Sequence, residues 1–165
     1  MPRIPSIHPD IASQKTKHLY ENIQNKLGSI PNLLKVMGNS PAVLKGYLAF
    51  NDALNQNTLG GELNELIGLT VANANGSDYC HAAHFHQGKK VICLNIVILE
   101  HAMHGTSHDH KIDEALKFAL EVIKTKGKVS DKMFKKIKSA GYNYTQISEI
   151  IATVALIFLP ITLIM

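Results

Sequence analysis

The helical spacing of apolar residues between short breakers is the feature that most constrains the fold of this chain. Leu19, Ile23 and Leu27 recur at intervals of four residues on one helical stripe, which Gly28 ends. No segment has a convincing alternating strand pattern. The periodic segments predict helices over residues 13–27, 31–38, 40–54, 62–73, 77–90, 96–103, 112–124, 130–140 and from 145 or 148 onward. The sequence therefore predicts an all-α helical bundle in a single domain, residues 1–165.

The composition is that of a folded protein. Of the 165 residues, 45% are hydrophobic and 18% are charged, which argues against disorder. Much of the formal net charge of +4 comes from a run of lysines: Lys124, Lys126, Lys128, Lys132, Lys135, Lys136 and Lys138. These lysines lack interleaved aromatic residues and no nucleic-acid-binding motif accompanies them. They predict a solvated helix face and no nucleic-acid partner.

Two cysteines, Cys80 and Cys93, are too few for a disulfide framework. Residues 1–5 have no apolar core of the kind found in a secretory signal peptide. We therefore expect a reducing, cytoplasmic location. Cys93 lies between the apolar pair Val91-Ile92 and Leu94, which predicts a buried and inert thiol.

The C-terminal segment, residues 150–165, is almost wholly apolar. A membrane span needs about 20 apolar residues. This run is shorter than that and Pro160 interrupts it. We expect a buried terminal helix or an oligomer interface here, and no contact with a membrane.

The segment from Asn75 to His84 places a thiol and an imidazole one helical turn apart. Residues 73–76 form a stop signal, and Ser77 is a favoured N-cap residue for the helix that follows. Cys80 then falls in the first turn, where the helix dipole favours a thiolate. His84, four residues later, shares its face and is a neighbouring base. The pair is a candidate reactive centre.

Glu65 is a candidate third member of this centre. It lies twelve residues before Ser77, and its helical row contains Leu69 and Ala72, so it occupies an apolar stripe. A carboxylate in that position is expected to be partly buried and to need a partner. Two antiparallel helices joined by the turn could bring it towards His84. The alternative is a glutamate stabilised only by the nearby helix N-terminus.

Seven of the nine histidines lie between residues 81 and 110. His81, His84 and His86, together with Cys80, could bind zinc or copper, although their spacing is not that of a known structural zinc site. The remaining four are interpreted as surface-loop residues: His101, His104, His108 and His110. The sequence contains no glycine-rich phosphate loop and no serine-nucleophile elbow, and we predict no cofactor.

With these residues in view, the chain resembles the carboxymuconolactone decarboxylase-like family, and most closely its alkylhydroperoxidase D-like, peroxidase-related branch. That branch has a glutamate, about a dozen residues, and then C-x-x-C-x-x-x-H. This chain has Glu65, then Ser77-Asp78-Tyr79-Cys80 and His84. The flanks are also similar, over residues 30–33, 40–41, 118–119, 130, 140–141 and 147–150.

The resemblance implies an all-α subunit that assembles as a homo-oligomer, either a trimer or a hexamer. It also implies a thiol-dependent peroxidase or disulfide-exchange activity, with a peroxide as substrate and a thiol or dithiol as reductant. In that scheme Cys80 attacks the peroxide, while His84 and Glu65 relay the proton. The first motif cysteine would close a disulfide with Cys80.

Ser77 departs from this pattern, because a hydroxyl group cannot form a disulfide. Three explanations stay open. The serine was introduced to disable the enzyme, or it is natural and an external thiol reduces a Cys80 sulfenic acid, or redox chemistry has been lost. Nothing in the sequence indicates that Cys93 substitutes for the missing thiol.

Two other functions remain as alternatives. One is the thiol-independent acid–base chemistry of the family's decarboxylases, with His84 and Glu65 acting on a small lactone-like acid. Retention of Cys80 weighs against it. The other is a non-catalytic metal-binding module that uses His81, His84 and Cys80.

Overall fold

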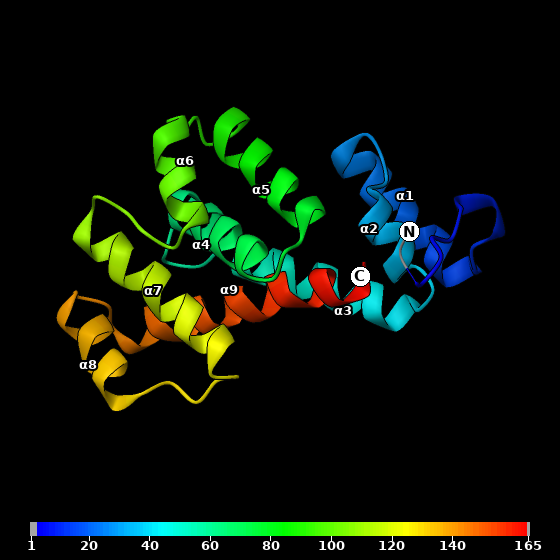
Figure 1. Ribbon diagram of the computed structural model, residues 1–165. Coiled ribbons are helices and arrows are strands. Elements are labelled where there is room, and N and C mark those ends of the chain that lie inside the picture. Colours follow the sequence, from blue (N-terminus) through cyan, green and yellow to red (C-terminus); the bar gives the residue numbers. More distant parts are fainter. Residues whose placement is uncertain (1–2, 165) are drawn as a thin grey trace. The chain divides into compact units, whose positions relative to one another are not determined.

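The computed structural model describes residues 3–164, and within that range the regular structure is helical, with no strand. The predicted all-α class is confirmed. The elements are η1 (Pro9–Ile11), α1 (Gln14–Leu27), α2 (Asn32–Met37), α3 (Pro41–Leu54), α4 (Gly61–Ala74), α5 (Asp78–Lys90), α6 (Ile96–Met103), α7 (His110–Lys124), α8 (Asp131–Ser139) and α9 (Tyr144–Leu163), as Figure 1 shows. By internal contacts they form two compact units, residues 3–53 with 162–164 and residues 54–161. Whether the whole chain acts as a single domain stays a prediction.

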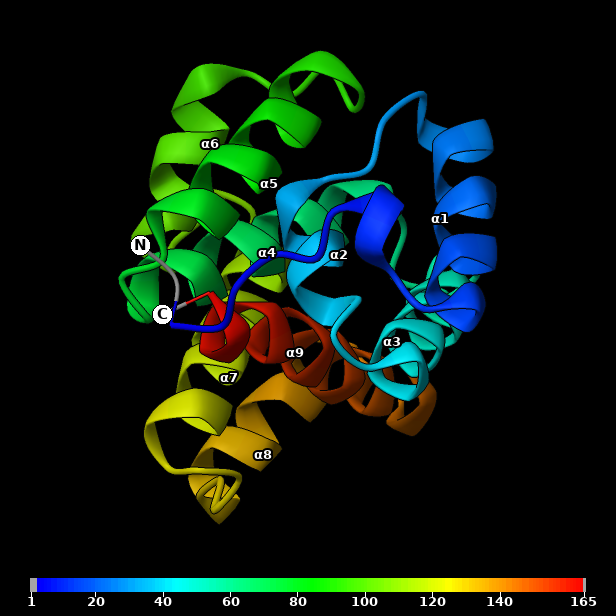
Figure 2. The ribbon, with the colours of Figure 1, turned by 90° about the vertical axis from the view of Figure 1, so that its right-hand side faces the viewer.

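The smaller unit holds α1, α2 and most of α3, which Figure 2 shows grouped together. Its core is built from Tyr20, Ile23, Leu34, Met37 and Leu44, all nearly or fully buried. The Tyr20 hydroxyl donates to the carbonyl of Lys35 at 3.3 Å, so the largest core side chain does not bury an unpaired polar atom.

The larger unit is organised around α4. Every residue from Leu66 to Ala72 is buried, which is typical of a helix surrounded by others. Helices α5, α6 and α7 all pack against it. The side chains that reach out of α4 towards these neighbours are therefore held by a rigid element.

Helix α7 begins at His110, two residues before the predicted start, because the Asp109 side chain accepts a hydrogen bond from the backbone N–H of Ile112 and caps the helix there. On α8 three of the lysines are exposed, as predicted: Lys132, Lys135 and Lys136. Lys138 instead lies with its Nζ 4.0 Å from the centre of the Tyr144 ring, so this lysine contacts an aromatic face.

Helix α9 corrects one expectation about the C-terminus. It continues through Pro160 to Leu163, so the proline does not interrupt it. Over its 20 residues α9 is long and apolar enough to cross a membrane, by length and composition alone. Ile147, Ile150 and Val154 lie on one buried stripe of α9, which is the pattern of a helix in a protein core.

Candidate redox site

The turn between α4 and α5 fixes where the candidate site begins. Gly76 adopts a left-handed φ of 64°, and its N–H donates to the carbonyl of Asn73 while the Ser77 N–H donates to that of Ala72, at 3.0 Å each. This pair of bonds is a Schellman ending for α4. Ser77 then starts the next helix at once, since its Oγ accepts from the Cys80 N–H at 3.4 Å. The predicted N-cap role of Ser77 is confirmed.

Helices α4 and α5 run antiparallel from this turn. Gly61 near the start of α4 faces Ile92 just beyond α5, and Gly68 in mid-helix faces His84. The hairpin brings together two of the predicted site residues. His84 Nδ1 lies 2.8 Å from Glu65 Oε2, with the two side chains 25% and 18% exposed. The alternative for Glu65 was a glutamate stabilised only by a helix N-terminus. It is wrong, since the carboxylate has a specific partner in His84.

The Glu65 contact determines which imidazole nitrogen is available. An ionised carboxylate only accepts hydrogen bonds, so Nδ1 of His84 carries the proton in that pair. Nε2 of the neutral ring then has a free lone pair and can act as a base. This arrangement, carboxylate to imidazole, orients and polarises the ring.

Gly68 is a site residue that the sequence reading missed. A Cβ placed on Gly68 would lie 2.5 Å from His84 Nδ1, well inside van der Waals contact. Glycine at position 68 therefore leaves the space in which the His84 imidazole lies against α4. The available signal was a glycine inside an apolar helix, three residues after Glu65, which often marks a close approach.

Cys80 lies in the first turn of α5 and is 5% exposed. Burial raises the pKa of its thiol above the ordinary value of 9.0, and a hydrogen bond with the Ser77 side chain lowers it by less. Desolvation of the charged form raises the pKa more than the Ser77 hydrogen bond lowers it, so the net direction is opposite to the thiolate expected at this helix start. Among the described residues, no hydrogen bond joins the Cys80 thiol to His84.

Both cysteines are free thiols. Cys93 is exposed, not buried as its apolar neighbours suggested. Its left-handed φ of 62° places it in the connection between α5 and α6, where the chain turns at the surface. The prediction of an inert core thiol at this position is wrong.

The remaining histidines of α5 do not join the Glu65–His84 pair. His81 lies beside Phe85, with ring centres 5.9 Å apart, and its buried Nε2 has no hydrogen-bond partner. His86 is exposed. Over residues 3–164 no three His, Cys, Asp or Glu side chains are grouped so that they could hold a metal ion.

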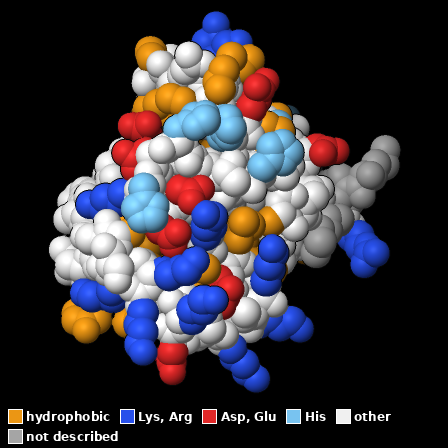
Figure 3. All heavy atoms as spheres, turned by 60° about the vertical axis from the view of Figure 1, so that its left-hand side comes forward, with side chains coloured by type: hydrophobic (Ala, Val, Ile, Leu, Met, Phe, Trp, Pro, Cys, Tyr) orange, Lys and Arg blue, Asp and Glu red, His pale blue; other side chains and the backbone are white. Residues whose placement is uncertain are grey.

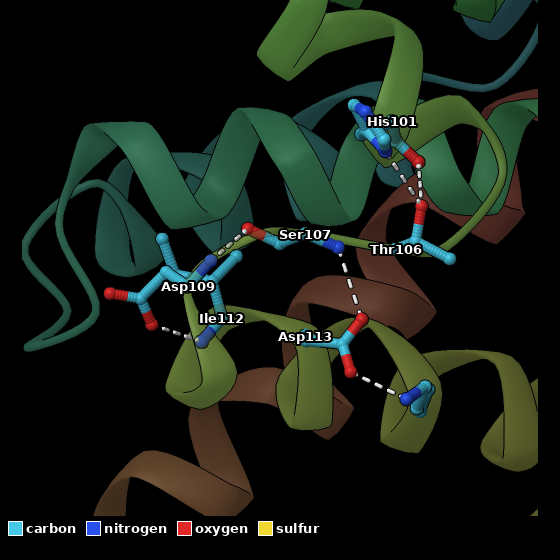
Figure 4. A network of polar contacts seen from close by, with 7 residues as sticks. His101, Thr106, Ser107, Asp109, Ile112 and Asp113 are labelled. Carbon is cyan, nitrogen blue, oxygen red and sulfur yellow. Dashed lines mark hydrogen bonds and ion pairs between the residues drawn. The ribbon is translucent and has the colours of Figure 1, made fainter.

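Of the four histidines interpreted as surface-loop residues, His104 and His108 are exposed in the connection between α6 and α7, and His110 is exposed at the start of α7. His101 departs from the interpretation. It lies half-buried on α6, and its ring centre is 4.4 Å from that of His108. Its Nδ1 lies 3.3 Å from Thr106 Oγ1, as Figure 4 shows. The same connection is tied to α7 by the Ser107 N–H, which donates to Asp113 at 3.0 Å. These bonds fix the link between α6 and α7.

Searches of sequence and of structure give different results. No protein-family model matches the sequence, and no curated protein matches it either. Solved structures do match. An uncharacterised peroxidase-related protein from Ralstonia eutropha JMP134, described as an alkylhydroperoxidase AhpD core, superposes with a TM-score of 0.82 at 20% identity, covering 98% of this chain and 87% of that one.

Two further structures agree. An uncharacterised peroxidase-related protein from Silicibacter sp. TM1040 has a TM-score of 0.80 at 21% identity, covering 96% of this chain and 88% of that one. The debrominase Bmp8, as a cysteine-to-alanine variant in complex with 2,3,4-tribromopyrrole, has a TM-score of 0.78 at 19% identity, covering 97% and 87%. The predicted resemblance is confirmed at the level of the fold, and the chain has the all-α fold of the alkylhydroperoxidase D-like proteins.

Proposed function

We propose that this chain is a thiol-dependent oxidoreductase that reduces peroxides at Cys80. The observation that carries the proposal is the Glu65–His84 pair, 2.8 Å apart on the helix hairpin whose second helix holds Cys80 in its first turn. An oriented base one helical turn from a thiol is what nucleophilic sulfur chemistry needs. The similar structures named peroxidase-related support the same class of reaction.

Because Cys80 is buried, its thiol needs a base, and His84 is the candidate for that role. A desolvated thiol with a raised pKa is mostly protonated near neutral pH, so it needs a base at the moment of attack. In the proposed first step Nε2 of His84 takes the thiol proton. The sulfur attacks one peroxide oxygen, the O–O bond breaks, and the departing alkoxide takes the proton back from His84. Cys80 is oxidised to a sulfenic acid and the peroxide is reduced to an alcohol.

Ser77 decides how the cycle closes. Its hydroxyl caps α5 and cannot form a disulfide with Cys80. An external thiol therefore attacks the sulfenic acid, releasing water and leaving a mixed disulfide on Cys80. A second external thiol attacks this disulfide, restores the Cys80 thiol and leaves as the oxidised disulfide of the reductant. The proposed reductant is thus a small thiol or dithiol, and the enzyme works with one cysteine.

The test is a peroxide-consumption assay with tert-butyl hydroperoxide and dithiothreitol, run beside trapping of Cys80 with a sulfenic-acid probe. We expect trapping in the native chain and none in Cys80→Ser. We expect Ser77→Cys to turn over faster, because it supplies the second sulfur within the motif. Cys93→Ser is the matched control and should behave as the native chain. Absence of trapping together with inactivity of Ser77→Cys would contradict the proposal.

A second candidate reaction is thiol-dependent removal of bromide from an aromatic ring. The debrominase Bmp8, which shares this fold, is described as a cysteine-to-alanine variant in complex with 2,3,4-tribromopyrrole, and the same class of compound is a candidate substrate for Cys80. Here Cys80 would take the bromine from a ring that gains a proton, and an external thiol would then displace bromide. Bromide release from 2,3,4-tribromopyrrole with dithiothreitol, lost in Cys80→Ser, distinguishes this reaction from peroxide reduction.

A further inference from the structure

Cys80 is nearly closed off from solvent, although the first turn of α5 (residues 77–81) lies largely at the surface. The Cys80 residue is 5% exposed, whereas Asp78 and Tyr79 just before it are exposed. The proposed reaction needs more room than this. It brings a peroxide and then an external thiol to the sulfur, and the mixed disulfide places a second sulfur about 2 Å from Sγ. Cys80 therefore has to become more accessible during the cycle.

Few contacts hold the first turn of α5. The Ser77 Oγ accepts the Cys80 N–H at 3.4 Å, which is longer than the usual range of about 2.7–3.2 Å and makes a weak cap. The His81 N–H donates to the Ser77 carbonyl at 2.9 Å and closes the turn. Within α5, all of which the structure describes, the buried residues are Cys80 and Gly88. The turn is thus fastened by one buried side chain, and the next anchor along the helix is the ion pair at His84.

The closed turn also carries an energetic cost at His81. The Nε2 atom of its ring is buried and has no hydrogen-bond partner within residues 3–164. A buried polar atom without a partner is unfavourable, because it has given up its hydrogen bond to water. His81 follows Cys80 directly, so unwinding the turn brings water to this nitrogen and relieves the cost. The closed form is therefore weakly fastened and contains a group that favours opening.

We propose that the first turn of α5 opens reversibly, and that the peroxide and the external thiol reach Cys80 in this open form. The identity of the two molecules rests on the proposed function, whereas the opening rests on the helix alone. Opening breaks the Ser77 cap and the His81 bond and leaves the buried part of α4 intact. His84 lies beyond the turn and keeps its contact with Glu65, so the base stays near the freed thiol. The closed turn protects the thiol, and whatever loosens the turn raises its reactivity.

The test is alkylation of Cys80 by iodoacetamide in a Cys93→Ser background, which leaves Cys80 as the single thiol. The pH is fixed below the ordinary thiol pKa of 9.0. Ser77→Ala removes the side-chain cap and should speed alkylation at least about twofold, because losing an N-cap bond favours the open form. If the closed form reacted directly, this variant would be slower, because the Ser77 hydrogen bond lowers the pKa of the thiol.

Ser130→Ala is the matched control, because it removes the same kind of cap from another helix. The Ser130 Oγ accepts the Met133 N–H at 3.2 Å at the start of α8. That helix packs against α7. Figure 3 shows Lys and Arg side chains gathered on the lower part of the face that it presents, where this lysine-rich helix lies. A cap lost there weakens α8 and not the first turn of α5, so the alkylation rate of Cys80 should stay unchanged.

Hydrogen exchange measures the same opening without any reagent at the thiol. The His81 amide should exchange at least about tenfold faster than the amides of residues 66–72 in α4, and faster again in Ser77→Ala. Three results would overturn the proposal: slower alkylation in Ser77→Ala, equal acceleration in Ser130→Ala, which would indicate global unfolding, or a His81 amide as protected as those of α4. None of these measurements uses peroxide. A chain that opens in this way but consumes no peroxide therefore contradicts the proposed function and leaves the opening standing.

Discussion

His84 Nδ1 and Glu65 Oε2 lie 2.8 Å apart across the α4–α5 hairpin, although 19 residues separate them in sequence. Both side chains are mostly shielded from solvent. A hydrogen bond to an ionised carboxylate is stronger than a neutral one, and shielding keeps it from exchanging with water. The pair is thus a fixed unit that holds one ring nitrogen protonated.

The first prediction concerns this unit. His84→Ala should slow the reaction of Cys80 with tert-butyl hydroperoxide by about 100-fold, because the base is lost. Glu65→Gln should slow it by at least about tenfold, since an amide can hold the wrong tautomer. Stopped-flow kinetics of sulfenic-acid formation gives both rates. Glu62→Gln, a change on the exposed first turn of the same helix, is the control and should be silent. Equal rates in all variants would show that Cys80 reacts without this base.

The second prediction concerns Gly68. Gly68→Ala should destabilise the protein by about 1–3 kcal/mol, because its methyl group meets the His84 ring at 2.5 Å. The double variant Gly68→Ala/His84→Ala should recover most of that loss, since the ring is gone. Urea unfolding of the two single variants and the double variant measures the coupling.

Gly46→Ala is the control for the Gly68 experiment. Gly46 lies inside α3, is exposed, and a Cβ there meets nothing within 4 Å. This change should stabilise the chain by about 0.5–1 kcal/mol, as alanine does in an open helical position. Destabilisation of similar size at both glycines would mean that the His84 contact is not the cause.

The third prediction concerns the pH dependence of Cys80. Burial raises its pKa above 9.0 and the Ser77 hydroxyl partly opposes this, so alkylation by iodoacetamide should still be rising above pH 9. The folded thiol holds its proton more tightly than the unfolded one. Its contribution to stability is therefore complete below the unfolded pKa and is lost as pH rises towards the folded pKa.

Ser77→Ala should move the alkylation midpoint of Cys80 to still higher pH. Measurements in a Cys93→Ser background isolate this thiol, and exposed Cys93 in a Cys80→Ser background gives the reference curve. Removal of the N-cap also costs about 0.5–2 kcal/mol of stability, which a thermal melt records. A midpoint for Cys80 below that of Cys93 would contradict the burial argument.

Many of the helix bounds of this chain could be predicted from local sequence signals. The breakers at Gly28 and Gly76 and the cap at Ser77 act over a few residues, so the helix bounds near them were predicted almost to the residue. The approach of Glu65 to His84 was one of two open alternatives, because a stripe pattern gives the face of a residue but not its partner. Hairpin packing decided between them.

The errors share a physical cause. The net pKa direction of Cys80 and the exposure of Cys93 depend on how much other chain covers each thiol, and apolar sequence neighbours do not report that. The sequence predicts an interruption at Pro160, yet α9 continues through this buried proline, because tertiary packing overrides the local preference. Gly68 was missed for the same reason, since its partner comes from another helix.

The fourth prediction concerns Asp113. Desolvation by burial would raise its pKa, but hydrogen bonds from the Lys117 side chain and the Ser107 N–H outweigh this, so the pKa is lowered below 3.8. The carboxylate thus contributes stability above the unfolded pKa and loses it as pH falls through the folded pKa. Asp113→Asn should lower the urea midpoint at pH 7 and flatten its fall as the pH drops below the ordinary carboxyl pKa of 3.8.

Asp131→Asn is the matched control for Asp113. Asp131 is exposed in the first turn of α8, away from the α6–α7 link. Its substitution should change the free energy of unfolding by less than about 0.5 kcal/mol, as is usual for surface sites. If the urea midpoints of Asp113→Asn and Asp131→Asn depend on pH in the same way, the proposed role of the Asp113 carboxylate is wrong.

The fifth prediction concerns self-association. The resemblance implies a homo-oligomer, and α9 exposes Ile151 and Phe158 beside an apolar groove of about 270 Å³. We expect the double variant Ile151→Glu/Phe158→Glu to lower the mass measured by analytical ultracentrifugation. A matched change at exposed Leu27 and Val91, also to glutamate, should leave the mass unaltered.

The close contact of Gly68 with the His84 ring has a consequence for how such sequences can change. A side chain at position 68 and an imidazole at position 84 exclude each other, because they claim the same volume. Substitution at one position therefore depends on the residue at the other. Alanine is accommodated at position 68 only after the histidine at position 84 has been replaced. Among chains of this fold that place glutamate and histidine as this one does, the two positions should vary together, and a larger residue at 68 would mark a chain whose histidine no longer lies against α4.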